Sequence, residues 1–377
     1  MNKKSFWWVV AVIIIVIVVV LVASNAGTNQ SGPIKIGFIE ALTGDTANFG
    51  VSMKGGLDLA IKEINAAGGI RGQQIQAIYE DGKCNGRDAA TAAQKLISVD
   101  HAKYLIGMIC AGEVLGVAPI SEQNKVFMMV QGSSPDITHV GKYIVRTSPS
   151  DALSGQALAG FAIQKGFKTV AVIKENTDFS MGLDTSFESS YKQQGGVVLD
   201  SEMFNSGTTD FRSLLTKIKS LKPDMIFIDP QSGENAARIA TQARDLGIAS
   251  QFFGAFFTGP EYVNAGVAAN GTYMVDMPAF DASSTVSTSF LSSFKSLTGI
   301  EPAYPYYAAA TYDQMKLLAQ AWNAVGYEDT DKVRDYIHSV SSYDGVIGSF
   351  HFDENGDVVG ILHRIVQVRS GKIVPVN

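Results

Sequence analysis

Residues 34–69 read IKIGFIEALTGDTANFGVSMKGGLDLAIKEINAAGG, and this stretch decides the fold. Its first part, Ile34–Leu42, is a short apolar run that predicts a strand. The apolar residues that follow recur at the spacing of one helix face, at Leu57, Ala60, Ile61 and Ile64. Gly68 and Gly69 end this predicted helix, because glycine accepts the left-handed conformation at a helix C-terminus. A strand, a polar loop and a helix in this order predict one unit of a parallel α/β sheet.

The same order returns in residues 170–196, which again run from a strand through a polar loop into a helix that Gly-Gly closes. Strands and helices alternate as far as residue 255, which is typical of parallel sheets. Helices dominate after residue 277, and residues 346–376 predict hairpins. We interpret the two similar stretches as two α/β lobes.

The predicted fold class is therefore α/β, with two doubly wound parallel-sheet lobes joined by three crossovers. The first lobe is expected to take residues 34–148 and 277–352, and the second lobe residues 149–276 and 353–377. The crossovers are expected near Thr147, Met277 and Phe352.

A hydrophobic helix is expected before the lobes. Residues 6–23 carry no charge and follow Lys3 and Lys4, so residues 1–26 predict a signal peptide or a membrane anchor. Residues 27–33 are a polar linker. Because positive residues stay on the cytoplasmic side, we expect the lobes to be extracytoplasmic, in the periplasm or at the cell surface. We favour attachment to the cytoplasmic membrane through the apolar run, with cleavage as the alternative.

The composition excludes several classes of function. Thirty Lys and Arg against 36 Asp and Glu give a net charge of −6, which disfavours nucleic-acid binding. The chain has no phosphate-binding glycine loop, no GxSxG, no CxxC and no HExxH. We therefore expect a binding protein rather than an enzyme, with no metal and no cofactor.

Cys84 and Cys110 are the two cysteines of the chain, and both lie in the part expected outside the cytoplasm. Such a pair predicts a disulfide, because that compartment is oxidising. Two separate buried thiols are the alternative.

Two predicted strand-to-helix junctions have the character of anion sites, residues 110–112 and residues 131–136. Each contains a glycine, Gly112 or Gly132, that would let a ligand approach the backbone. Free N–H groups at the start of a helix and the Ser133 hydroxyl would hold a carboxylate. Helix capping is the alternative explanation for the same residues.

Several segments together resemble the leucine/isoleucine/valine-binding proteins, the periplasmic branched-chain amino-acid receptors of ABC transporters. They are INAAGGIRG at 64–72, YEDGKC at 79–84, IGMIC at 106–110, QARDLGI at 242–248 and PYYAAATYD at 305–313. The resemblance covers residues 34–376 and implies a type I periplasmic-binding fold with a small-molecule ligand in the cleft. It also implies an ABC permease as the partner.

The resemblance assigns ligand contacts in the first lobe. The carboxylate site falls on Ala111 and Ser133, where Ala111 replaces a serine and keeps its backbone N–H alone. The carbonyl that takes the ligand ammonium falls on Gln131. The aromatic residues that cover the ligand fall on Phe49 and Tyr307, for which core packing is the alternative.

In the second lobe, Phe179 takes the place of a tyrosine, and a second tyrosine position falls on Gln231 or Ser232. Capping of a helix is the alternative for the latter two residues. The acid that pairs with the ammonium falls on Phe256, which carries no charge. Asp229 or Glu113 would have to supply it, or the ligand lacks an ammonium.

These observations predict an extracytoplasmic solute-binding protein that closes two lobes around a small amino-acid-like ligand. The alternative is a membrane-tethered sensor of the same fold, which binds an amide or a carboxylate and signals to a membrane partner.

Overall fold

The computed structural model describes residues 32–376, apart from 256–259, 264, 277–279 and 282. The expected anchor at residues 6–23 and Phe256 lie outside the described residues. Within those residues, no helix combines the length and the apolar character that crossing a membrane requires.

The first sheet has five parallel strands in the order β2-β1-β3-β4-β5. Its strands are β1 Ile34–Glu40, β2 Ile75–Asp81, β3 Tyr104–Gly107, β4 Phe127–Val130 and β5 Ile144–Arg146. Between them run α2 Ala47–Ala66, α3 Gly86–Ser98, α4 Ala111–Asn124 and the short 3-10 helix η1 Pro135–His139. Every residue of β3 and β4 is buried, as expected for strands that helices cover on both faces.

The second sheet has seven strands in the order β15-β14-β10-β9-β8-β6-β7. Its strands are β6 Thr169–Glu175, β7 Val197–Phe204, β8 Met225–Asp229, β9 Gln251–Ala255, β10 Tyr273–Asp276, β14 Arg364–Arg369 and β15 Lys372–Pro375. Its helices are α5 Asp151–Gln164, α6 Asp178–Gln193, α7 Arg212–Leu221, α8 Gly233–Asp245 and α9 Pro260–Val263. The hairpin of β14 and β15 joins antiparallel, so this sheet is mixed rather than fully parallel.

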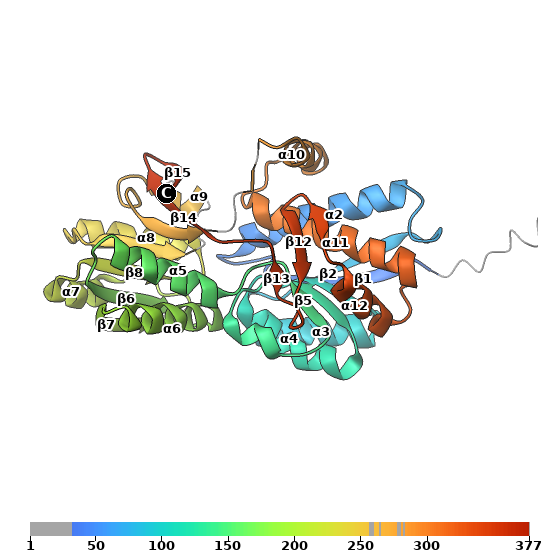
Figure 1. Ribbon diagram of the computed structural model, residues 1–377, viewed down its shortest axis with the longest axis horizontal. Helices are drawn as coiled ribbons and strands as arrows, with labels where there is room; N and C mark the ends of the chain where they lie inside the picture. The colour runs from blue at the N-terminus through green and yellow to red at the C-terminus, as the bar shows by residue number, and fades with distance from the viewer. Residues whose placement is uncertain (1–31, 256–259, 264, 277–279, 282, 377) are drawn as a thin grey trace, which may run out of the picture.

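The remaining elements are α10 Thr285–Thr298, α11 Pro305–Val325 and α12 Thr330–Ser339, with the small sheet β11 Tyr343–Gly345, β12 Gly348–Phe352 and β13 Val358–Val359. Figure 1 shows them beside the first sheet, with the second sheet at the opposite end of the long axis. Helix α11 packs against α2.

The chain passes between the two sheets after β5, after β10 and after β13. We propose that each of the two large sheets, together with its helices, forms one lobe. The third crossing falls later than its expected place near Phe352, because Val358 and Val359 still pair with β12 and Asp357 bridges Arg146 of β5. We therefore place the boundary near residue 360.

The predicted disulfide between Cys84 and Cys110 is confirmed, with 5.2 Å between the two Cα atoms. It joins the segment after β2 to the residue before α4. Both segments lie at the carboxyl ends of their strands, where ligands of open α/β sheets bind.

Candidate functional site

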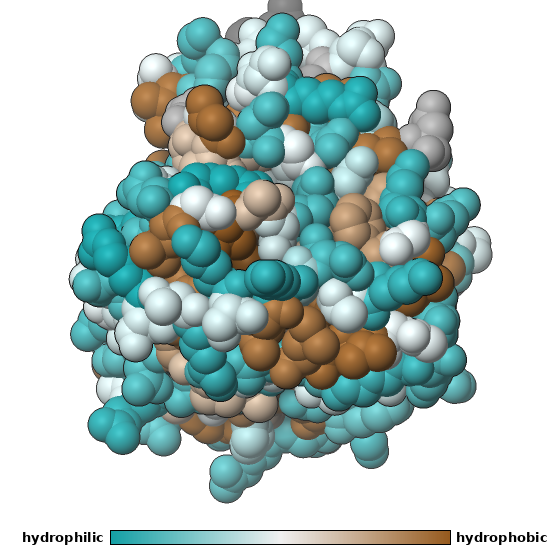
Figure 2. All heavy atoms as spheres, turned by 90° about the vertical axis from the view of Figure 1, so that its left-hand side faces the viewer, coloured by the Kyte–Doolittle hydropathy of each residue, from teal (hydrophilic) through white to brown (hydrophobic). Residues whose placement is uncertain are grey.

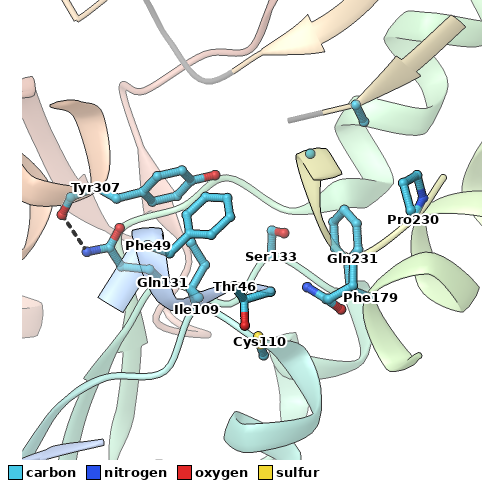
Figure 3. A pocket seen from close by; sticks show the side chains of 12 residues that line it. Thr46, Phe49, Ile109, Cys110, Gln131, Ser133, Phe179, Pro230, Gln231 and Tyr307 are labelled. Atoms are coloured by element: carbon cyan, nitrogen blue, oxygen red, sulfur yellow. Dashed lines mark hydrogen bonds between the residues drawn. The ribbon is translucent and has the colours of Figure 1, made fainter. Parts of the chain in front are cut away.

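A cavity lies between the two sheets and takes its walls from both (Figure 3). It holds about 470 Å³ of space, counted with the solvent at its mouth. Among the residues expected to contact a ligand, those that line the cavity are Phe49, Gln131, Ser133, Phe179, Gln231 and Tyr307. The structure adds Thr46, Ile109, Cys110, Pro230, Gly233 and Ala255.

Aromatic rings form much of the cavity wall. Phe49 of α2 stacks on Tyr304 with 3.7 Å between ring centroids and meets Tyr307 edge-on at 5.4 Å. Figure 3 shows Phe49 and Tyr307 on one side of the cavity and Phe179 of α6 on the other. Because these rings come from both lobes, an apolar group between them would be enclosed from two sides.

Gln131 contributes to the wall in an unexpected way. Its Nε2 donates to the Tyr307 carbonyl at 3.0 Å and to Thr311 Oγ1 at 2.5 Å, so its side chain ties the loop after β4 to α11. Its Oε1 is buried without a hydrogen-bond partner among the described residues.

Gly132 lies where a larger residue would not fit. A Cβ at Gly132 would come within 2.8 Å of Ile137 Cδ1 and 2.9 Å of Val114 Cγ2. Packing against these two side chains is therefore by itself enough to favour a glycine at this position. Gly132 is not among the described residues that line the cavity.

Ser133 and Ser134 divide two tasks. Ser134 Oγ accepts from the Asp136 N–H at 3.4 Å and so caps η1, whereas Ser133 faces the cavity. Burial raises the pKa of Asp151, and a hydrogen bond from the Ser133 hydroxyl partly offsets this increase. The resulting pKa of Asp151 is about 7. Ser133 is thus placed between a buried carboxyl group and the cavity.

Two helix N-termini meet the cavity, those of α4 and α8, through Cys110 and Gly233. Ala111 is the first residue of α4 and is buried behind the wall. Ser232 Oγ accepts from Asn235 N at 3.2 Å, which makes Ser232 the cap of α8. The first N–H groups of a helix have no acceptor within the helix, so both ends favour an anion.

Neither acid expected to replace the missing one lines the cavity. Asp229 is fully buried at the end of β8, and neither of its oxygens has a hydrogen-bond partner within the described part of the chain. Burial first, then Asp184 and Asp151, raise the pKa of Asp229 well above its usual value. Glu113 accepts from the Cys84 N–H at 3.0 Å, and burial raises its pKa to about 8.

Sequence reasoning missed the lining residues that carry no obvious chemistry. Ile109, Pro230 and Ala255 all lie at or just after the ends of β3, β8 and β9. The rule that ligands bind beyond the carboxyl ends of parallel strands pointed to these segments. It gave no means to choose the residue that faces inward.

Comparison with known proteins gives consistent results. The family model described as "Periplasmic binding protein" matches residues 33–372. A leucine-, isoleucine-, valine-, threonine- and alanine-binding protein of Pseudomonas aeruginosa is 25% identical over 330 residues, 86% of this chain and 87% of the relative. A leucine-specific-binding protein of Salmonella typhimurium is 27% identical over 343 residues, 89% of this chain and 90% of the relative.

Two solved structures have folds similar to that of this chain. The crystal structure of a leucine-binding protein from Thermotoga maritima matches with a TM-score of 0.82 and 28% identity, over 91% of this chain and 98% of that one. A branched-chain amino-acid transporter substrate-binding protein of Streptococcus pneumoniae, in complex with isoleucine, matches with a TM-score of 0.81 and 27% identity. This match covers 90% of this chain and 97% of the streptococcal one.

Proposed function

Because this chain belongs to the periplasmic binding protein family, we propose that it is the extracytoplasmic solute-binding protein of an ABC transporter. It binds a small amino-acid-like ligand between its lobes and delivers that ligand to a permease. The observation that carries this proposal is the cavity itself, whose walls come from both lobes at the carboxyl ends of their strands. A tethered sensor of the same fold is the alternative.

The cavity supports a ligand with a carboxylate and an apolar group. The N-termini of α4 and α8 attract a carboxylate, and the Ser133 hydroxyl would turn from Asp151 to donate its proton to that carboxylate. The rings of Phe49, Phe179 and Tyr307 suit a branched aliphatic or similar apolar side chain. Binding needs no covalent step, and closure of the lobes would exclude water from the ligand.

The cavity wall bears on whether the ligand carries an amino group. None of the described residues that line the cavity has an acidic or basic side chain. The segment FFTG at 256–259, where the resemblance places the pairing acid, also carries no charge in its sequence. A buried ammonium without a partner is costly. This favours, as a second candidate, a branched carboxylate without an amino group.

Two ligands that differ in the amino group separate these candidates. We propose isothermal titration and thermal unfolding with L-leucine and with 4-methylpentanoate, which keeps the leucine carbon chain and carboxylate. A ligand at 100 times its Kd adds about 2.7 kcal/mol of stability. Tighter binding of leucine supports the amino-acid candidate, and tighter binding of 4-methylpentanoate supports the second. If neither binds, nor any amino acid or short carboxylate, the solute-binding proposal is wrong.

We also propose that the lobes lie outside the cytoplasmic membrane, attached through residues 6–23. Cell fractionation and mass spectrometry of the mature N-terminus test this. A mature chain that begins after residue 26 would replace the anchor with a cleaved signal peptide.

A further inference from the structure

The strands β1 and β6 end alike, although they belong to different sheets. Each is seven residues long, and its last residue is a buried glutamate, Glu40 or Glu175. Each strand lies between two parallel neighbours, β2 and β3 for β1, and β7 and β8 for β6. The two glutamates therefore occupy matching places in the two lobes.

Each carboxylate accepts a hydrogen bond from the backbone of the loop that follows a neighbouring strand of its sheet. Glu40 Oε2 accepts from the Ile109 N–H at 3.0 Å, after β3. Glu175 Oε2 accepts from the Gln231 N–H at 2.9 Å, after β8. Both hydrogen bonds are partly buried, and a partly buried N–H that loses its acceptor is destabilising, so both loops depend on these carboxylates.

The held residues share a second property, because Ile109 and Gln231 both line the cavity. Each also lies two residues before a helix, since α4 begins at Ala111 and α8 begins at Gly233. The two carboxylates thus fix the two segments that bring helix N-termini to the cavity.

We propose that Glu40 and Glu175 are matched positioning residues that set the two walls of the ligand cavity, one from each lobe. The inference rests on the proposed function, because its purpose is to hold the anion-binding ends of α4 and α8 in place. Neither glutamate is among the described residues that line the cavity, so each acts through the residue it holds.

The second oxygens of the two carboxylates differ, and this difference gives a sharp test. Glu40 Oε1 accepts from the Ala41 N–H at 3.0 Å, whereas Glu175 Oε1 accepts from the Ser206 hydroxyl at 2.6 Å. In Glu175→Gln the amide can accept from the Gln231 N–H and donate to the Ser206 oxygen. In Glu40→Gln the amide must oppose one backbone N–H with its own N–H groups.

Hydrogen exchange measured by mass spectrometry tests the inference without a ligand. We expect Glu40→Gln to speed exchange at least tenfold at the Ile109 amide or at the Ala41 amide, whichever of the two faces the new N–H groups. Glu175→Ala should do the same at Gln231, and Glu175→Gln should restore protection. The control is Asp313→Asn, because Asp313 is also buried and accepts from the Val346 and Ile347 N–H groups at 2.9 Å each, away from the cavity.

Affinity gives the second readout, with L-leucine and 4-methylpentanoate as probes. We expect Glu175→Ala to lower the affinity for the probe that binds by at least tenfold. Glu175→Gln should bring this affinity back to within about twofold of the parent value. Asp313→Asn should lower the melting temperature without lowering the affinity for the probe. If exchange at both Ile109 and Ala41 is the same in Glu40→Gln as in Asp313→Asn, the inference for the first lobe is overturned.

If Glu40→Gln does not fold, the alanine and glutamine variants of Glu175 still test whether such a glutamate positions the cavity wall. Unchanged exchange at Gln231 and unchanged affinity in Glu175→Ala would overturn the inference for the second lobe. A parent protein that binds neither probe, while the exchange pattern follows the expectation, would instead count against the proposed function.

Discussion

Arg146 is the residue whose replacement should affect both stability and binding most clearly. It lies at the end of β5 and is 1% exposed. Its Nε and Nη2 donate to the Asp357 carboxylate at 2.7 and 2.9 Å, and Nη2 also donates to Thr138 Oγ1 at 2.7 Å. Its Nη1 donates to the Ser133 and Ser134 carbonyls at 3.1 and 2.7 Å. The guanidinium therefore holds the loop that presents Ser133 to the cavity.

The cost of Arg146→Met follows from these contacts. Removing one partner of a buried ion pair costs about 3–5 kcal/mol, because the other charge stays behind. The Asp357 side chain is 18% exposed, so water reaches it and the loss should lie near the lower end, at about 3 kcal/mol. Loss of both carbonyl contacts also frees the Ser133 loop, so affinity for a carboxylate probe should fall at least tenfold.

Urea unfolding and isothermal titration measure the two effects. Arg334→Met is the matched control, since its partners Asp331 and Asp335 are more exposed and such pairs contribute under about 1 kcal/mol. We expect the control to keep the parent affinity. If Arg146→Met loses no more stability than Arg334→Met, or binds the probe as tightly as the parent, the role assigned to Arg146 is wrong.

Three other predictions concern the disulfide, the cavity and pH. Replacing Cys84 and Cys110 by serine should lower the free energy of unfolding by about 3.5 kcal/mol, from the chain entropy of a loop with a separation of 26 residues, as urea unfolding would show. Ser133→Ala should weaken a carboxylate probe about tenfold in titration, through loss of one charge-assisted hydrogen bond, and equal losses of stability and affinity would contradict this. Burial first, and then Arg146, lower the pKa of His363 from 6.5 to about 4. The unfolded chain therefore binds the extra proton between these values, so stability is lost as pH falls from 6.5 to 4, and His363→Gln should flatten that part of the unfolding profile.

Much of the architecture could be predicted because it depends on local patterns. The spacing of apolar residues in 34–69 places β1 and α2, and the repeat in 170–196 places β6 and α6. The polar loops at strand ends located the cavity, because parallel strands bring their carboxyl ends to one edge. The cysteine pair was predictable from its expected compartment.

The direction of side chains at those loops could not be predicted, because it depends on how each loop packs against its surroundings in the folded protein. Gln131 turns toward the carbonyl of Tyr307, 176 residues later, and Gly132 faces Ile137 and Val114. Ser232 caps a helix while its neighbour Gln231 lines the cavity. Adjacent residues of a loop look equivalent in sequence, and packing alone assigns their roles.

The sequence by itself determined the order of strands and helices, the two-lobed plan and the position of the cavity, because periodicity and strand ends are local properties. Tertiary structure decided which charges are available to a ligand. Asp229 stands at the end of a strand in the sequence, but the second lobe buries it completely. Glu40 and Glu175 have no local signal, because their partners Ile109 and Gln231 follow a neighbouring strand. Burial and pairing across strands are set when the sheets assemble, and no window of sequence contains both partners.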